Sequence, residues 1–444
     1  MNRNVSSALQ NAPSGGRREQ MPLSLTPSKR TNNKRVIVAA SLGNALEMFD
    51  FTVFSFFSGI IGRQFFPVDN ASGQLMLALS TFGVGFLARP LGGVLIGGYA
   101  DRRGRKAALA LTIGLMTLGT GLIATAPPYA TLGIGAPLLV VIGRLLQGLS
   151  AGGEFGASTT YLMESGSVAG RGYMVSWQSI SQGASILLGS LFGTLLTGLL
   201  SHAALESWGW RIPFAFGLLI GPVGLYIRRN LDETHRASSE EASPVAVLLR
   251  LYPGRILHGV LLLVGSTTGM YVMGYYLPSY AVRELHLPAA TSLLSGCAAG
   301  VAMIIGGFIS GQLTDRLKAR KPFLCANFGA VLLVTYPIFA LLNTYPSVPL
   351  IVGASFIMML IGAVSGSAFI LLLLESFPRE VRVTGLSVVY AVGVTLFGGF
   401  AQFNVTWLLQ VTRNPMSLAW YLVIASAISF AALILFRERK YRNE

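Results

Sequence analysis

The 444-residue chain is 52% hydrophobic and only 11% charged, which is more apolar surface than one soluble core could bury. This composition indicates an integral membrane protein. The formal net charge of +15 lies in short basic clusters between long apolar stretches, a pattern that favours contact with lipid headgroups over nucleic-acid binding. Cys297 and Cys325 both lie within apolar stretches and support neither a disulfide framework nor a metal site.

Residues 1–35 are polar and rich in Ser, Asn, Arg and Pro. They lack the small-residue cleavage pattern of a signal peptide, so we predict a disordered cytoplasmic tail. Twelve apolar stretches follow, each long enough to cross about 30 Å of hydrocarbon as a helix. They lie at 36–62, 74–100, 107–126, 134–162, 172–200, 211–227, 256–281, 290–313, 322–342, 348–374, 384–410 and 418–436.

The distribution of Lys and Arg predicts the orientation of the chain. An even number of spans places both termini on one side of the membrane, and 27 of the 33 basic residues fall in the tails and loops of that side, against 4 in the opposite loops. By the positive-inside rule, both termini are expected in the cytoplasm. We therefore expect a multi-pass protein of the cell (cytoplasmic) membrane.

An internal repeat divides the chain into two halves. The pattern Gly-x-x-x-Asp-Arg follows the second span and recurs after the eighth, and a Glu–Arg pair seven residues apart follows both the fourth and the tenth. We predict two six-helix bundles, 36–229 and 255–444, joined by a cytoplasmic linker at 230–254; the second bundle ends in a short cytoplasmic tail. The paired positions are Gly97, Asp101 and Arg102 with Gly311, Asp315 and Arg316, and Glu164 and Arg171 with Glu375 and Arg382.

Several motifs resemble a known transporter family. The segment Gly97-Gly-Tyr-Ala-Asp101-Arg-Arg-Gly104-Arg105-Lys resembles the loop signature of the major facilitator superfamily, and Arg144-Leu-Leu-Gln147-Gly resembles its helix 4 motif. The resemblance implies an all-α membrane fold, with twelve transmembrane helices in two pseudo-symmetric six-helix bundles. The second copy of the loop signature, beginning at Asp315-Arg316, lacks the expected glycine.

Further segments resemble the metabolite:proton symporters of this superfamily, and the likeness covers about residues 36–440. Two of them, Ser176-Trp-Gln178-Ser179 and Tyr161-Leu-Met-Glu164, look most like the citrate and tricarballylate carriers. The other segments are Gly43–Phe51, Phe86–Gly92, Ser150–Glu154 and Trp208–Phe214.

Five charged residues lie inside predicted spans, all in the first half: Glu47, Asp50, Arg89, Arg144 and Glu154. Each costs about 2.5–3.5 kcal/mol to insert, so intramembrane charges indicate function more often than static helix packing. Counting about 1.5 Å per residue, Glu47 or Asp50 can pair with Arg89 by depth, whereas Arg144 lies nearer the outside. A static salt-bridge network is the competing interpretation.

These residue types divide into three expected roles. Arginines stay charged and bind carboxylates bidentately, so they suit an anionic substrate, while a buried carboxylate can exchange a proton. The substrate-binding candidates are Arg144, Arg89, Asn44, Gln147, Gln178, Tyr275 and Asn404, with Tyr271, Tyr276 and Gln402 as further cage residues; the proton-coupling candidates are Asp50, Glu47 and Glu154. The gating candidates are Gly97, Asp101, Arg102, Gly104, Arg105, Glu164, Arg171, Asp315, Arg316, Glu375 and Arg382.

Two enzyme-like patterns are rejected because they fall inside membrane helices. They are Gly148-Leu-Ser-Ala-Gly152, which fits a nucleophile elbow, and Gly83-x-Gly-x-x-Ala88, which fits a loose dinucleotide fingerprint. No Gly-Lys dipeptide is present, which excludes a P-loop. We expect no enzyme activity, no cofactor and no metal, and transport energised by the proton gradient.

The sequence thus predicts a monomeric, alternating-access symporter that imports a small organic anion, such as citrate or tricarballylate, together with protons. It is expected to contact the lipid bilayer and no nucleic acid. Alternatives remain open: a proton symporter for a dicarboxylate, shikimate or betaine/proline, an intramembrane hydrolase or isomerase, or a membrane sensor that binds ligand without transporting it.

Overall fold

The computed structural model describes residues 33–103, 105–152, 154–229, 244–378 and 381–436. Residues 1–32 of the expected tail, Gly104, residues 230–243 of the expected linker and the C-terminal residues 437–444 lie outside this description. All regular structure in the described ranges is helical, which confirms the all-α prediction.

The first half consists of these helices: α1 (Asn33–Phe56), α2 (Ser58–Phe65), α3 (Ala71–Arg103), α4 (Arg105–Thr125), α5 (Tyr129–Leu132), α6 (Gly135–Ala151), α7 (Glu154–Ser165), η1 (Val168–Gly170), α8 (Arg171–Leu199), α9 (His202–Ser207), η2 (Gly209–Arg211) and α10 (Ile212–Arg229). The helix α11 (Pro244–Leu251) lies within the range expected to form the linker.

The second half consists of α12 (Pro253–Tyr271), η3 (Val272–Tyr276), α13 (Leu277–Arg283), α14 (Ala289–Ser292), α15 (Leu294–Arg316), α16 (Arg320–Thr344), α17 (Val348–Val364), α18 (Gly366–Ser376), α19 (Arg382–Val394), η5 (Thr395–Gly399), α20 (Ala401–Thr412) and α21 (Ser417–Leu435). Both η3 and η5 are π-helical turns inside longer spans.

Eight helices of the described residues are long and apolar enough to cross a membrane, or nine if α1 and α2, which meet at a bend of 66°, form one span. The other expected spans coincide with α4, with α6 and α7 together, and with α10. Each of the twelve apolar stretches of the sequence therefore coincides with helical structure.

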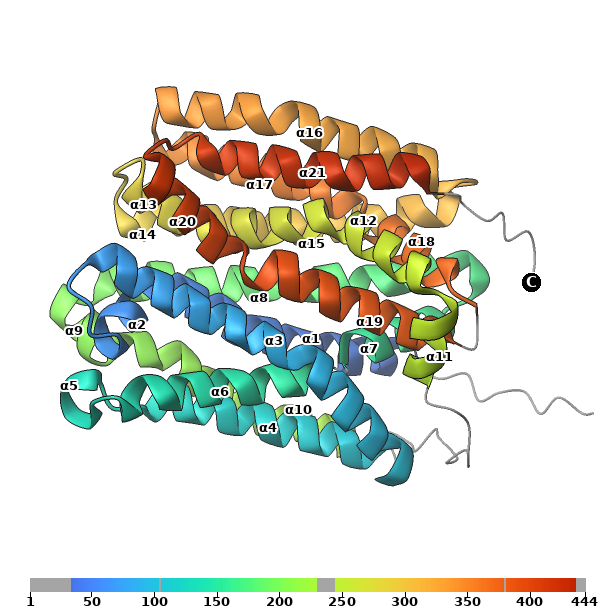
Figure 1. Ribbon diagram of the computed structural model, residues 1–444, viewed down its shortest axis with the longest axis horizontal. Coiled ribbons are helices and arrows are strands. Elements are labelled where there is room, and N and C mark those ends of the chain that lie inside the picture. The colour runs from blue at the N-terminus through green and yellow to red at the C-terminus, as the bar shows by residue number, and fades with distance from the viewer. Residues whose placement is uncertain (1–32, 104, 153, 230–243, 379–380, 437–444) are drawn as a thin grey trace, which may run out of the picture.

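The long helices run roughly parallel, and the short helices α2, α5, α9, α13 and α14 gather at one end (Figure 1). In this view α3, α4, α6 and α10 lie below, and α12, α16, α17 and α21 lie above. The halves meet mainly where α8 packs on α15 and α3 packs on η5 and α19. Small residues permit this close approach: a methyl group added at Gly300 would lie 2.6 Å from the backbone nitrogen of Leu187.

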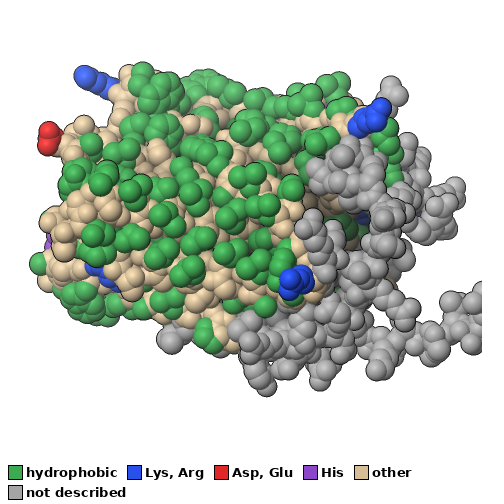
Figure 2. All heavy atoms as spheres, turned by 60° about the horizontal axis from the view of Figure 1, so that its bottom comes forward, with side chains coloured by type: hydrophobic (Ala, Val, Ile, Leu, Met, Phe, Trp, Pro, Cys, Tyr) green, Lys and Arg blue, Asp and Glu red, His purple; other side chains and the backbone are tan. Residues whose placement is uncertain are grey.

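Apolar side chains cover the outer face of the molecule. Figure 2 shows them spread across the face turned toward the viewer, with Lys and Arg near its margins. Leu91 and Leu95 of α3 are 62% and 64% exposed, and Leu199 at the end of α8 is 80% exposed. An apolar surface of this extent is expected of a protein whose solvent is lipid.

Candidate functional site

Helices α1, α3 and α6 bring four of the five predicted intramembrane charges into the interior. Glu47, Asp50, Arg89 and Arg144 are each at most 6% exposed. Glu154, the first residue of α7, is half-buried. The four buried charges form two separate clusters, each of which joins an arginine to a carboxylate of α1.

In the first cluster, Nη2 of Arg89 lies 3.0 Å from Oε1 of Glu47. The contact is an ion pair without hydrogen-bond alignment, because Nε and Nη2 of Arg89 have no hydrogen-bond partner among the described residues. The guanidinium carbon Cζ lies 4.1 Å from the ring centre of Phe86 and 4.9 Å from that of Phe51. Aromatic faces and one carboxylate therefore hold this cation in place and leave N–H donors for a ligand.

The second cluster is a chain of hydrogen bonds. Nη1 of Arg144 donates to Oε1 of Gln147 (2.8 Å), and Nε2 of Gln147 donates to Oδ2 of Asp50 (3.1 Å) and to Oγ1 of Thr120 (2.9 Å). The Thr120 hydroxyl in turn donates to the same Asp50 oxygen. Gln147 thus links the guanidinium to the carboxylate, while Nε and Nη2 of Arg144 have no hydrogen-bond partner in the described part of the chain.

By depth alone either Glu47 or Asp50 could pair with Arg89, and in the structure the partner is Glu47. Asp50 lies one helical turn further along α1, in the cluster of Arg144. Phe51 contacts both clusters, since Cζ of Arg144 lies 5.1 Å from its ring centre and Cζ of Arg89 lies 4.9 Å from it. Thr120 was not predicted, because a single threonine in an apolar helix carries no distinguishing signal in the sequence.

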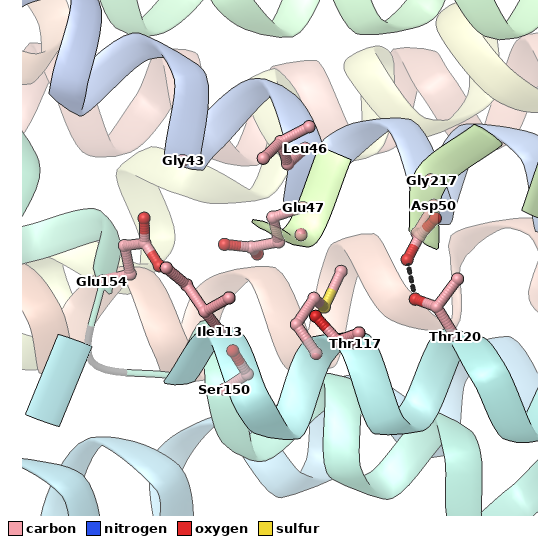
Figure 3. A pocket seen from close by; sticks show the side chains of 12 residues that line it. Gly43, Leu46, Glu47, Asp50, Ile113, Thr117, Thr120, Ser150, Glu154 and Gly217 are labelled. Atoms are coloured by element: carbon pink, nitrogen blue, oxygen red, sulfur yellow. Dashed lines mark hydrogen bonds between the residues drawn. The ribbon is translucent and has the colours of Figure 1, made fainter. Parts of the chain in front are cut away.

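A small pocket borders both clusters inside the first half. Its walls include the carboxylates Glu47, Asp50 and Glu154. Figure 3 shows these three side chains in succession along the pocket, with Ile113, Thr117 and Thr120 of α4 on the facing wall. The interior offers about 50 Å³ to water-sized molecules. This is room for a few waters and not for an organic anion.

Two predicted substrate residues hold helices together in this conformation. Nδ2 of Asn44 donates to the Gln178 carbonyl (3.2 Å) and to the Ser181 hydroxyl (2.6 Å), which ties α1 to α8. Nε2 of Gln178 donates to the hydroxyls of Ser158 and Thr159 and so ties α8 to α7. Oε1 of Gln178 is buried without a partner among the described residues.

The polar residues predicted in the second half divide between two places. Tyr275 of η3 is fully buried and stacks on Tyr271, whose ring also packs edge-on against Phe86. The Ser55 hydroxyl of α1 donates to Oε1 of Gln402 (2.7 Å), which joins the halves near this aromatic pair. Asn404 instead donates to the Tyr421 hydroxyl (3.3 Å) within the second half.

One gating candidate joins the two halves directly. Asp315, at the end of α15, accepts the backbone N–H groups of Gly172 (2.7 Å) and Tyr173 (3.0 Å) at the start of α8. The carboxylate therefore caps the positive end of the α8 dipole. The missing glycine of the second loop signature does not prevent this contact.

Of the remaining gating candidates, only some have side chains in the described part of the structure. Glu375 forms an ion pair with Arg320, whereas Nε of Arg382 and Nε of Arg171 are buried without a hydrogen-bond partner in the described ranges. Arg316 is exposed. Gly97, Asp101 and Arg102 lie in α3, Arg105 in α4 and Glu164 in α7, but their side chains fall outside the described part of the structure, as does Gly104 entirely.

Comparison with known proteins gives a consistent match over most of the chain. Residues 40–401 match the family model described as Major Facilitator Superfamily. A citrate-proton symporter of Klebsiella pneumoniae is 35% identical over 401 residues, which cover 89% of this chain and 90% of the relative. An alpha-ketoglutarate permease of Escherichia coli is also 35% identical, over 94% of this chain and 96% of the relative.

A proline/betaine transporter of Escherichia coli is 31% identical over 92% of this chain and 84% of its own length. Among solved structures, a D-xylose-proton symporter superposes with a TM-score of 0.74 at 21% identity, covering 91% of this chain and 97% of the other. At that identity the structural likeness bears on the fold, which it supports across nearly the whole chain.

Proposed function

This chain belongs to the major facilitator superfamily of membrane transporters, and from that premise we propose that it is a proton-coupled symporter importing an organic anion with several carboxylates, such as citrate or tricarballylate. The observation that carries the proposal is the pair of buried arginines with unpartnered N–H donors. Similarity to citrate-proton symporters supports the same substrate class.

The spacing of the two arginines suits a polycarboxylate. Their Cζ atoms lie 4.9 and 5.1 Å from the centre of the same Phe51 ring, so their separation cannot exceed these two distances combined. Each guanidinium can bind a carboxylate through two parallel N–H donors. A ligand with two or more carboxylates could bind both guanidinium groups at once, which a single carboxylate cannot do.

The aromatic residues favour an anion over a quaternary ammonium compound such as betaine. A cation cage needs free ring faces. Here Arg89 already lies over the ring of Phe86, and Cζ of Arg144 lies 3.6 Å from the ring centre of Phe54. The betaine alternative is therefore less well supported than a dicarboxylate, for which the alpha-ketoglutarate permease similarity is a specific observation.

For energy, we propose that Asp50, Glu47 or Glu154 carries the proton and that the transporter needs no cofactor. When a carboxylate beside an arginine takes up a proton, it no longer pairs with the arginine, which can then bind the negative charge of the substrate. This competition couples the movement of the proton to that of the anion. Both arginines are buried here, so substrate reaches them only when the halves separate. We further propose that the protein acts as a monomer in the cell membrane with both termini cytoplasmic.

The test uses purified protein in liposomes with acid outside. Labelled citrate, tricarballylate and alpha-ketoglutarate should enter faster than betaine, proline or shikimate, and a protonophore should abolish uptake. Arg89→Lys and Arg144→Lys should each lose most uptake although the charge is kept, because an ammonium cannot replace a planar two-donor contact.

Strong betaine or proline uptake without competition by polycarboxylates would overturn the substrate class while leaving a symporter. Binding of citrate without flux under any gradient would instead support a sensor. Uptake insensitive to the protonophore would contradict proton coupling.

A further inference from the structure

The pocket inside the first half is separate from the interface at which the two halves meet. Its walls come from α1, α4, α6, α7 and α10, all of them helices of the first half (Figure 1). The polar side chains that line it are Glu47, Asp50, Thr117, Thr120, Ser150 and Glu154.

One carboxylate oxygen in this pocket has no partner. Asp50 is 3% exposed, and its Oδ2 accepts the bonds from Thr120 and Gln147. Its Oδ1 is buried without a hydrogen bond among the described residues. A buried polar oxygen beside a space large enough for a few waters is a typical position for ordered water.

We propose that this pocket holds a short water chain that conducts the proton between Asp50 and Glu154, so that the proton moves through the first half while the anion moves between the halves. This inference rests on the proposed symport. In each step the protonated carboxylic acid gives its proton to a water, and that water gives a proton to the next water or carboxylate. The net change is the movement of one proton.

Glu47 connects the proposed water chain to the first cluster, in which Arg89 is a candidate for substrate binding. Its carboxylate lines the pocket and also pairs with Arg89. The charged groups facing the pocket are therefore Glu47 and Asp50 of α1 and Glu154 of α7, with Arg89 of α3 behind Glu47 and Arg144 of α6 behind Gln147. The pocket-lining positions of α4 and α10 are uncharged.

Two glycines of α10 keep the pocket open. A methyl group added at Gly221 would lie 2.5 Å from Oγ1 of Thr117, and one at Gly217 would lie 2.7 Å from Oδ1 of Asp50. Gly121 of α4 provides a matched control at the same helix contact, because a methyl group there would lie 3.7 Å from Leu218, an ordinary contact distance. Gly114 of the same helix has nothing within 4 Å.

The experiment compares two activities of the purified full chain in liposomes. Counterflow of labelled citrate between equal internal and external proton concentrations reports anion exchange, and acid-driven accumulation with an internal pH dye reports coupled proton entry. In Gly221→Ala we expect accumulation and proton entry to fall at least tenfold while counterflow stays within twofold of wild type. Gly121→Ala and Gly114→Ala should match wild type in both assays.

A rescue variant separates a blocked water path from a packing defect. Thr117→Ala removes the group that the new methyl would meet, so Gly221→Ala with Thr117→Ala should regain proton-driven accumulation. Wild-type accumulation in Gly221→Ala would overturn the inference, as would loss of counterflow and accumulation together. Failure of wild-type protein to couple citrate to protons would refute the proposed function itself and is visible before any variant is made.

Discussion

Phe51 is the residue shared by the two charge clusters. Its ring is fully buried and lies against both guanidinium groups. A displacement of either arginine therefore presses on the same side chain, and we expect Phe51 to transmit a change in one cluster to the other. Phe54 and Phe86 each contact one arginine closely, Arg144 and Arg89 respectively.

We expect Phe51→Leu to lower the ratio of protons to substrate by at least half, because a loss of cation–π contact of about 0.5–2 kcal/mol loosens the link between the clusters. Exchange should stay within about threefold of wild type, since each arginine keeps its closer ring, Phe86 for Arg89 and Phe54 for Arg144. The measurement is dye-detected proton entry per labelled citrate. Phe54→Leu and Phe86→Leu are the controls, and an equal fall of the ratio in all three would indicate general loss of packing.

Removal of a titratable oxygen tests the proton carriers. Asp50→Asn and Glu47→Gln, made separately, should both insert in the membrane, and at least one should abolish proton-driven accumulation, since an amide does not take up a proton in this range. Counterflow should survive in Asp50→Asn, because the amide oxygen can still accept from Thr120. Glu206→Gln is the control, since Glu206 pairs with Arg63 away from the pocket. Normal accumulation in both test variants would assign coupling elsewhere, with Glu154 next.

At this scale the sequence predicted which residues are charged inside the membrane, because charge in an apolar stretch is conspicuous. It left the pairing of Glu47 and Asp50 open, since residues three apart on a helix lie at similar depth and only side-chain packing separates them. It also missed Thr120 and the pocket, which depend on how the five helices α1, α4, α6, α7 and α10 pack around that space.

Among the elements, α3 and α6 approach each other closely enough for their backbones to touch. A methyl group added at Gly148 would lie 1.7 Å from the Gly85 carbonyl oxygen, and one at Gly152 would lie 1.8 Å from that of Arg89. Because the obstacle is backbone in both cases, a rotamer change cannot relieve it. A spacing of four residues between small side chains is typical of helices whose backbones approach closely.

We expect Gly148→Ala to destabilise the protein by about 1–3 kcal/mol or more, the usual effect of overpacking a tight interior. Thermal unfolding in detergent, monitored by size-exclusion chromatography, should show a clear fall in the transition temperature. The matched change Gly114→Ala should leave it unaltered, since nothing lies within 4 Å of that position. An unchanged transition in Gly148→Ala would mean that α3 and α6 can separate at little cost.

The positions of the twelve helical stretches followed from hydrophobic length alone, whereas their interruptions did not. The π turns η3 and η5 lie in apolar runs that read as continuous helix. Such turns form where packing favours one extra residue per turn, and they often occur at functional sites. Here they place Tyr275, whose carbonyl accepts from the Ser55 hydroxyl, and Gly399, which faces Phe86, at the interface between the halves.

On the scale of the whole molecule, Asp315 of α15 links the two halves by its hydrogen bonds to the start of α8. Asp315→Ala should remove the cap of α8 and weaken closure at this end, by about 0.5–2 kcal/mol for a lost N-terminal cap. A cysteine introduced at Ser376, the half-buried last residue of α18, which packs on α8 and α15, should then react faster with a membrane-impermeant maleimide. Arg316→Gln is the control, because Arg316 is exposed. Equal labelling in both variants would contradict a role for this contact in closure.

The internal repeat predicted a duplicated architecture, and the family match and superposition agree with that fold. The contacts between the halves could not be predicted, because they join residues more than a hundred positions apart. Asp315 with Gly172 and Ser55 with Gln402 are two examples. Nothing in local sequence periodicity relates such positions.

The uneven placement of charge has an electrical consequence. Three carboxylates and two guanidinium groups of the first half sum to −1 when all are ionised and to zero after one proton is bound. A transmembrane voltage does work of about 2.3 kcal/mol per 100 mV on each charge that crosses the full field. If these groups move through the field during the proposed transport cycle, we expect the empty, deprotonated carrier to respond to voltage as an anion, so that a potential negative inside favours its return toward the outer side. We therefore expect voltage to act directly on the step in which the empty carrier returns to the outward-facing state.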